Sequence, residues 1–200
     1  DEGEHVLLLV DSVTRFAEAH REVAIAAGEL PALRGFPPSI NQEIMGLCER
    51  AGSGHDESGD ITAIFSVLVA GSDMEEPIAD ILRGVLDGHV VMDREIAEKG
   101  RYPAIDFLKS VSRSLPKAAS TQENLLLSTT RSLLGAYAKS ENMIRAGLYR
   151  RGSDPLVDQA MSVHTDLEKF LSEQNSTTAE AAFTRLATIL RRASSSRQSG

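Results

Sequence analysis

The sequence places one carboxylate where a ligand or a metal ion could be held. Asp11 directly follows the apolar run at residues 6–10. A run of this kind, without polar alternation, predicts a strand that is buried on both faces, as in a parallel α/β sheet. Open α/β sheets bind their ligands at the carboxyl ends of their strands. Asp11 is therefore the first candidate for a binding residue.

The chemistry expected of Asp11 depends on what else the chain contains. In P-loop NTPases an acid at this place, the Walker B aspartate, helps to hold Mg²⁺. The phosphate-binding loop of those enzymes, Gly-x-x-x-x-Gly-Lys-Ser/Thr, does not occur in these 200 residues. Buried strands that end in Asp are also common in α/β proteins, so a purely structural role remains open at this point.

Three further side chains suit nucleotide chemistry. Tyr102, which precedes Pro103, can offer a flat face to an adenine ring. Arg113 carries a permanent planar charge that can stabilise transferring phosphoryl oxygens, and it can do so in the active site of a neighbouring subunit. Arg15 lies one helical turn after Asp11, which places its charge near the phosphates. The alternatives are a turn at Pro103, a solvated charge at Arg113 and an i,i+4 salt bridge between Arg15 and Asp11.

Composition and the remaining titratable residues limit the class of protein. The net charge of −8 argues against non-specific nucleic-acid binding. Cys48 is the single cysteine, which fits a reducing compartment, and neither it nor the five histidines show metal-ligand spacing. The apolar runs are too short to span a bilayer. Three acids, at residues 73, 75 and 76, form either a carboxylate site or a solvated loop.

The pattern of apolar residues predicts two domains with a boundary near residue 115. Strands are expected at residues 6–10, 61–69 and 88–92, with helices at residues 16–27, at residues 39–50 and after Pro77; this alternation indicates a parallel sheet. From residue 121 onward the spacing is helical, with later helices at residues 158–171 and 179–192. Residues 1–115 thus form an α/β part and residues 116–200 a helical part, with a frayed serine-rich tail around residues 194–196.

Several long blocks of the sequence together resemble the catalytic subunits of rotary-type ATPases. They cover, in the family's order, residues 7–39, 59–80, 86–106, 110–114 and 136–161. The last block is similar to the flagellar export ATPases (flagellum-specific ATP synthases) and their type III secretion relatives, and it lacks the acidic segment of F-type catalytic subunits. The resemblance implies the second half of a RecA-like P-loop NTPase core, followed by an all-helical C-terminal domain, in a ring of six subunits.

The resemblance also assigns roles to particular residues. Asp11 matches the Walker B acid, which holds the Mg²⁺ of ATP through water, and Arg15 matches the arginine just after it. Tyr102 matches the aromatic residue that stacks on adenine, and Arg113 matches the arginine finger. The loop between Gly71 and Pro77 matches the segment that faces a coiled-coil central stalk.

The chain departs from the family pattern in two respects. F-type catalytic subunits add a second aromatic residue after a stretch similar to Phe-Leu-Ser-Gln-Pro, and at that stretch this chain reads Phe-Leu-Ser-Glu-Gln-Asn, from Phe170 to Asn175. Adenine is then held on one side only, or Phe170 is displaced from that role. The P-loop, the glutamate that polarises the attacking water and the N-terminal β-barrel of the family are not found in these residues. We therefore expect the 200-residue chain alone to bind ATP weakly and to hydrolyse none.

The function implied by the resemblance is ATP hydrolysis that energises flagellar type III protein export. The implied location is the cytoplasm, at the membrane of the flagellar base. The implied partners are further copies in a homo-hexamer, the central stalk, the export apparatus, a regulator and chaperone–substrate complexes, without nucleic acid or a transmembrane segment. Two alternatives remain, a non-catalytic ring subunit and an injectisome secretion ATPase.

Overall fold

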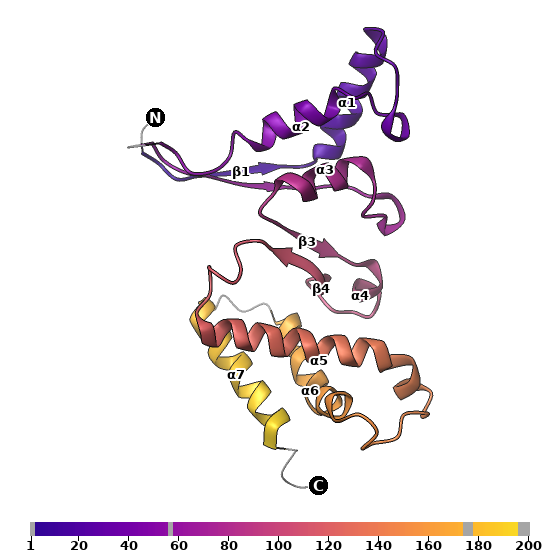
Figure 1. Cartoon of the computed structure of the whole chain (residues 1–200), viewed down its shortest axis with the longest axis vertical. Coiled ribbons are helices and arrows are strands. Elements are labelled where there is room, and N and C mark those ends of the chain that lie inside the picture. Colours follow the sequence, from indigo (N-terminus) through magenta and orange to yellow (C-terminus); the bar gives the residue numbers. More distant parts are fainter. Residues whose placement is uncertain (1–2, 56–57, 174–177, 196–200) are drawn as a thin grey trace. The chain divides into compact units, whose positions relative to one another are not determined.

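The computed structural model describes residues 3–55, 58–173 and 178–195 (Figure 1). The chain divides into two compact units, Asp1–Asp87 and Gly88–Gly200, which we call the N-terminal unit and the C-terminal unit. Each unit has its own two-stranded sheet and its own hydrophobic cluster. None of the described helices is both long enough and apolar enough to cross a membrane.

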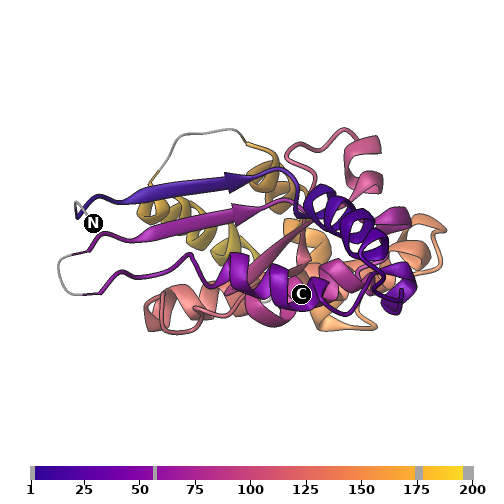
Figure 2. The same cartoon turned by 90° about the horizontal axis from the view of Figure 1, so that it is seen from above.

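The N-terminal unit contains the predicted parallel pair of strands. β1 (Val6–Val10) pairs in parallel with β2 (Ile61–Phe65), and Figure 2 shows the two strands side by side with their carboxyl ends at the same edge. The remaining elements are α1 (Val13–Ala26), the 3₁₀ turn η1 (Leu33–Gly35), α2 (Ile40–Cys48), the 3₁₀ turn η2 (Ala70–Ser72) and α3 (Pro77–Val85). β2 ends at Phe65, four residues before the predicted end, and the side chain of the next residue, Ser66, contacts the end of β1.

Helices supply most of the core of the N-terminal unit. Its fully buried side chains include Val13 and Ala17 of α1, and Ile40 and Ile44 of α2. Each pair is spaced i,i+4, which places both residues on one face of their helix. Ile78 and Leu82 of α3, a helix that begins at Pro77 as predicted, complete the cluster.

The prediction that β1 is buried on both faces is wrong for the described structure. Leu7 is 59 % exposed and Leu9 is 64 % exposed, whereas Leu8 and Val10 are half-buried. Val10 packs against the helical cluster of its unit. Among the described residues β1 has one strand neighbour, β2, and helices cover only one face of the pair. The exposed side chains of β1 thus lie on the face of the pair that no described helix covers.

The C-terminal unit begins with an antiparallel pair that the sequence analysis did not predict. β3 (Gly88–Met92) pairs with β4 (Ile105–Ser112), and α4 (Arg94–Glu98) lies between them in the chain. The expected strand at residues 88–92 is present, but it pairs antiparallel and not within a parallel sheet. β4 escaped prediction because polar residues such as Asp106, Lys109 and Ser110 interrupt its apolar alternation.

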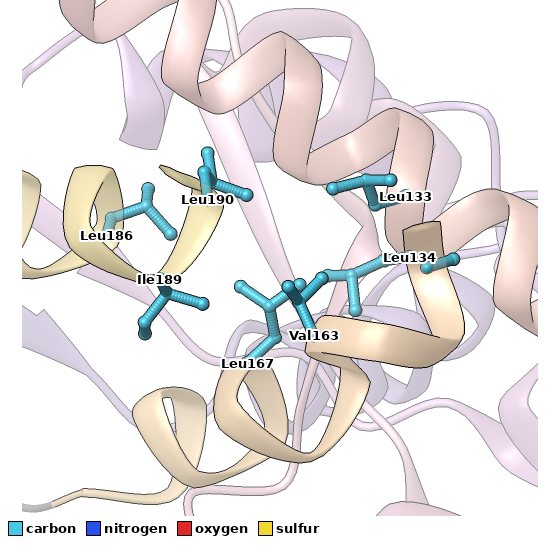
Figure 3. Packing of buried hydrophobic residues seen from close by; sticks show 8 residues of the cluster. Leu133, Leu134, Val163, Leu167, Leu186, Ile189 and Leu190 are labelled. Atoms are coloured by element: carbon cyan, nitrogen blue, oxygen red, sulfur yellow. The ribbon is translucent and has the colours of Figure 1, made fainter. Parts of the chain in front are cut away.

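The helical region after residue 120 is confirmed. It consists of α5 (Thr121–Arg145), α6 (Pro155–Ser172) and α7 (Ala179–Ser195). Their buried residues form one cluster: Leu133, Leu134, Ala160, Val163, Leu167, Leu186, Ile189 and Leu190. Figure 3 shows the labelled leucine, isoleucine and valine side chains of the three helices gathered in this cluster. α7 continues through Ser194 and Ser195, and the rest of the serine-rich tail lies outside the described residues. The boundary near residue 115 stays a prediction.

Candidate functional site

The carboxylate of Asp11 lies at the carboxyl edge of the β1–β2 pair. The hydroxyl of Ser66, the residue that follows β2, donates a hydrogen bond of 2.6 Å to Asp11 Oδ1. The Ser66 N–H donates to the carbonyl of Val10, and the Ser66 carbonyl accepts from the N–H of Val13, each over 3.0 Å. The end of β2 therefore holds the end of β1 and orients Asp11, whose side chain stays exposed to solvent.

The first turn of α1 is tied to the same edge. Ser12 caps the helix, its hydroxyl accepting from the backbone N–H of Arg15 over 3.3 Å. Thr14 Oγ1 accepts from the N–H of Leu68 at 2.9 Å and donates to the Leu68 carbonyl at 3.2 Å. The segments that follow β1 and β2 are thus joined by side-chain hydrogen bonds, at Asp11 through Ser66 and at Thr14 through Leu68.

Arg15 does not form the alternative salt bridge with Asp11. Its Nη1 lies 3.0 Å from Glu18 Oε2, one turn further along α1. Asp11 precedes the cap of the helix, so the i,i+4 geometry of a helical pair does not apply to it. The guanidinium is exposed, and its expected place near the phosphates remains a prediction.

The acidic loop at residues 71–77 is held by hydrogen bonds and by an ion pair to Arg34. Arg34 Nη1 lies 2.7 Å from Asp73 Oδ2, and this hydrogen bond, followed by one from the backbone N–H of Glu75, lowers the pKa of Asp73. Glu76 Oε1 accepts from the N–H of Ala70 at 3.2 Å. Two of the three acids, Asp73 and Glu76, therefore hold the loop. Within the described ranges no three histidine, cysteine or acidic side chains lie together as a metal site.

Tyr102 is presented to solvent between two anchored neighbours. Arg101, only 13 % exposed, pairs with Glu168 of α6 over 3.0 Å and donates to the Ile105 carbonyl. Ala104 is buried. The Tyr102 ring is 57 % exposed, so it is available to stack on a planar ligand.

Arg113 and Tyr102 stand at the two ends of β4. Arg113 directly follows the last strand residue, Ser112, and its side chain is exposed. The structure therefore places Asp11 and Arg15 at one strand–helix junction of the N-terminal unit, and Tyr102 and Arg113 around one strand of the C-terminal unit. That all four serve one reaction remains a prediction.

The sequence analysis did not single out the ionic contacts that shape β4. Lys109 Nζ bridges Asp93 Oδ2 at 2.8 Å and Asp106 Oδ2 at 3.2 Å. Both contacts raise the pKa of Lys109, and the hydrogen bond from Lys109 lowers the pKa of Asp93. The acids are sixteen and three residues from Lys109 along the chain. Only the shorter separation follows a spacing visible in the sequence, so the pairing with Asp93 required the strand fold.

A groove of about 390 Å³ lies between the β3–β4 region and the helices α5 and α6. In its wall the ring of His164 stacks on Tyr137, with centroids 3.5 Å apart and planes inclined by 17°. Burial lowers the pKa of His164, while the nearby carboxylates of Glu168 and Glu141 oppose that shift. The groove mixes acidic and basic side chains, so its lining indicates no single class of ligand.

Phe170 lies within the helical part of the C-terminal unit. It is half-buried and packs against the α5–α6–α7 cluster. The Arg185 guanidinium carbon lies 5.9 Å from the centre of its ring. The displacement of Phe170 from an adenine-facing role remains a prediction. Residues 174 and 175 of the same stretch lie outside the described residues.

Comparison with known proteins decides the family. The family model for the ATP synthase alpha/beta family, nucleotide-binding domain, matches residues 1–112. The chain belongs to this family. Residues 119–188 match a second family model, the T3SS EscN ATPase C-terminal domain. The two matches confirm the resemblance inferred from the sequence blocks, and also the α/β core followed by a helical region.

Curated relatives within this family carry flagellar and secretion names. The flagellum-specific ATP synthase of Caulobacter vibrioides is 46 % identical over 197 residues, which cover 95 % of this chain and 44 % of the relative. The type 3 secretion system ATPase of Xanthomonas euvesicatoria is 46 % identical over 173 residues, or 86 % of this chain and 39 % of the relative. The chain thus spans less than half the length of these relatives.

Solved structures of secretion ATPases share the fold. The assembled ATPase EscN of the enteropathogenic E. coli type III secretion system has a TM-score of 0.87 and 36 % identity, covering 92 % of this chain and 45 % of that chain. EscN in complex with its central stalk EscO has a TM-score of 0.81 and 37 % identity, covering 95 % of this chain and 45 % of that chain.

Proposed function

We propose that this member of the ATP synthase alpha/beta family serves in an ATPase that energises flagellar type III protein export. One observation carries the proposal: a nucleotide-binding match over residues 1–112 is followed in one chain by a type III secretion match over residues 119–188. The first match supports ATP as the substrate. The second supports protein export as the process that uses the energy. Family members that bind nucleotide without turning it over share the first match, so the test must measure turnover.

The edge that carries Asp11 fits a magnesium site. Its carboxylate is exposed at the end of β1, and the Ser66 hydroxyl lies beside it. Oxygen donors that leave room for water are the environment that Mg²⁺ prefers. When bound, the ion neutralises charge on the β- and γ-phosphates. We assign Asp11 to hold the ion through water, oriented by Ser66, and Arg15 to add positive charge near the phosphates.

The two residues around β4 have separate roles in the proposal. Tyr102 stacks its exposed ring on the adenine of ATP. Arg113 reaches the γ-phosphate bound by a neighbouring subunit, where its charge stabilises the transition state of an in-line attack by water. The phosphate-binding loop and the polarising glutamate of such a site are not among these 200 residues, so we expect the isolated chain to hydrolyse no ATP.

The proposed assembly is a homo-hexamer around a coiled-coil stalk. EscN, which is similar to this chain, was solved both as an assembled ATPase and in complex with its central stalk EscO. We assign the loop at residues 71–77 to face such a stalk. The export apparatus, a regulator and chaperone–substrate complexes are the further proposed partners, at the cytoplasmic side of the flagellar base.

The decisive test is Arg113→Ala in the complete enzyme, assayed for ATP turnover. Loss of an arginine finger should lower kcat by about 10³- to 10⁵-fold and leave the KM for ATP nearly unchanged, because the finger acts on transition-state charge. Arg145→Ala, which removes an exposed arginine from α5, is the control and should retain full activity. Full turnover in the Arg113→Ala enzyme would refute the assigned role of Arg113. No turnover in the unaltered enzyme would refute the ATPase function itself.

Injectisome export is the second candidate, since the Xanthomonas secretion ATPase and the Caulobacter flagellar relative are equally identical to this chain. Deleting the gene in its host separates the two. Loss of flagellar filaments supports the first candidate, and intact filaments with lost effector secretion support the second.

A further inference from the structure

β4, the strand between Tyr102 and Arg113, contains a bulge. β3 and β4 are in register at His89↔Val111 and again at Val91↔Asp106. Residues 107–110 of β4 therefore face Val90 alone. Extra residues in one strand of a pair leave backbone groups without partners in the ladder and change the direction of the strand. Those groups must be satisfied elsewhere, and the direction in which β4 leaves the bulge depends on how that is done.

Side chains of β4 accept hydrogen bonds from two N–H groups of the bulge. Asp106 Oδ1 accepts from the N–H groups of Leu108 and Lys109, at 2.9 and 3.1 Å. The Ser110 hydroxyl accepts from the N–H of Val91 at 3.0 Å and donates to the carbonyl of Asp106 at 2.6 Å. Side chains of β4 thus bind two N–H groups of the bulge and one of the partner strand.

A single helical side chain holds carbonyl groups of the bulge. Arg131 of α5 donates from Nη2 to the Ser110 carbonyl at 2.8 Å and from Nη1 to the Leu108 carbonyl at 3.3 Å. Its guanidinium carbon lies 4.6 Å from the centre of the Phe107 ring, and Phe107 packs against the helical cluster. A planar fork with several donors suits two carbonyls and an aromatic face together, whereas a lysine offers one point charge.

We propose that Arg131 is a positioning residue for Arg113, and that through it the helical region controls the arginine finger. Only Val111 and Ser112 separate Ser110 from Arg113. The direction of this short segment is determined by its pairing with β3 and by the bulge that Arg131 holds. A shift of α5 would therefore move the bulge and, with it, the arginine at the end of the strand. This inference rests on the proposed function, because it gives Arg113 the role of a finger.

The test compares Arg131→Gln and Arg131→Lys in the complete enzyme, alone and combined with Arg113→Ala. Misplacement of a catalytic group by a remote change should lower kcat by about 10- to 100-fold, with the KM for ATP unchanged. Lysine should restore little of the loss, because it lacks the fork. If Arg131 acts through Arg113, Arg131→Gln should cost nothing further in the Arg113→Ala background, measured by single-turnover hydrolysis. Arg145→Gln on the same helix is the matched control.

Hydrogen exchange of the β4 amides, read by mass spectrometry, supplies a second measurement that does not depend on activity. Arg131→Gln should speed exchange at residues 107–113 and leave that of α6 unchanged. A fall in kcat of the same size in both backgrounds would show a general structural role and overturn the proposal. So would unchanged kcat in Arg131→Gln while Arg113→Ala abolishes turnover, an outcome that leaves the proposed ATPase function intact. An unaltered enzyme without turnover would overturn that function and the inference with it.

Discussion

The β1–β2 pair and the α5–α6–α7 cluster both carry large apolar side chains, yet these side chains differ in burial. Leu7 and Leu9 of β1 are more than half exposed, whereas Val163 and Leu167 of α6 are 1 % exposed. The helices of the cluster cover one another's apolar stripes. The two strands have helices on one face only. The comparison shows that an apolar side chain is buried only where other elements cover the face of the strand or helix that carries it.

The candidate site residues also differ in what positions them, a strand end in one unit and a helix in the other. Asp11 is oriented by the end of a neighbouring strand, through Ser66. Arg113 follows a strand whose bulge is held by a helix, through Arg131. The first arrangement depends on contacts among segments of the N-terminal unit. The second makes a proposed catalytic group sensitive to the helical region.

The largest expected effect is a loss of stability from the α5–α6–α7 cluster. Leu167→Ala should reduce the free energy of unfolding by about 2 to 5 kcal/mol, because it removes buried methyl groups and leaves a cavity in a closed core. Urea unfolding of the 200-residue chain, followed by circular dichroism, measures this loss. Leu125→Ala, at a 67 % exposed position of α5, is the control and should change stability little. Equal losses from the two substitutions would contradict the assignment of the core.

A smaller effect is expected from a change of pH, and it too concerns the α5–α6–α7 region, because His164 lies on α6. Burial lowers the pKa of His164 below its ordinary value of 6.5. As the pH falls through that value, His164 gains a proton in the unfolded chain before it does so in the folded chain. The contribution of His164 to stability is therefore complete above that value and declines as the pH falls toward its folded pKa. Glu168 and Glu141 oppose the shift, and Lys99 adds to it.

Urea unfolding of the chain between about pH 7 and pH 5 measures this dependence, the range being set by the ordinary histidine pKa. His164→Phe keeps a ring against Tyr137 but removes the titration, so it should make the stability curve flatter over that range. A variant curve parallel to that of the unaltered chain would show that His164 does not carry the effect.

The smallest effect on stability is expected from a substitution in the β1–β2 pair. Leu9→Thr should change the free energy of unfolding by no more than about 0.5 kcal/mol, because the side chain is already mostly exposed and threonine favours strands. The same urea experiment measures it, with the half-buried Leu8→Thr as the matched control that should cost more. A loss from Leu9→Thr as large as that from Leu167→Ala would mean that the exposed face of β1 is covered in solution.

The sequence predicted the regular elements well where apolar spacing was uninterrupted. β1, β3, α6 and α7 lie close to their expected ranges because each has a clear period or an unbroken apolar run. α1 begins three residues earlier than expected, since Ser12 supplies the cap. The candidate residues Asp11, Arg15, Tyr102 and Arg113 were all named from the sequence, on residue type, spacing and resemblance.

The sequence did not predict the features that depend on a contact between distant segments of the chain. β4 was missed because its polar residues serve the bulge, and a bulge is recognisable only when the partner strand is known. Ser39 was expected at a helix start, and it does precede α2. Its hydroxyl, however, donates to Glu29 and contacts His20 in place of a capping bond. Such choices depend on which groups the fold brings within hydrogen-bond distance.

By itself, the sequence determined the family, the α/β-then-helical order and the chemical types available to a nucleotide site. These follow from short-range periodicity and from blocks of residues in a characteristic order. Only the tertiary structure decided that β1 is half exposed, that Ser66 orients Asp11, and that Arg131 holds the strand leading to Arg113. Each of these is a contact between residues far apart in the chain, and its geometry exists only after the intervening segments have packed.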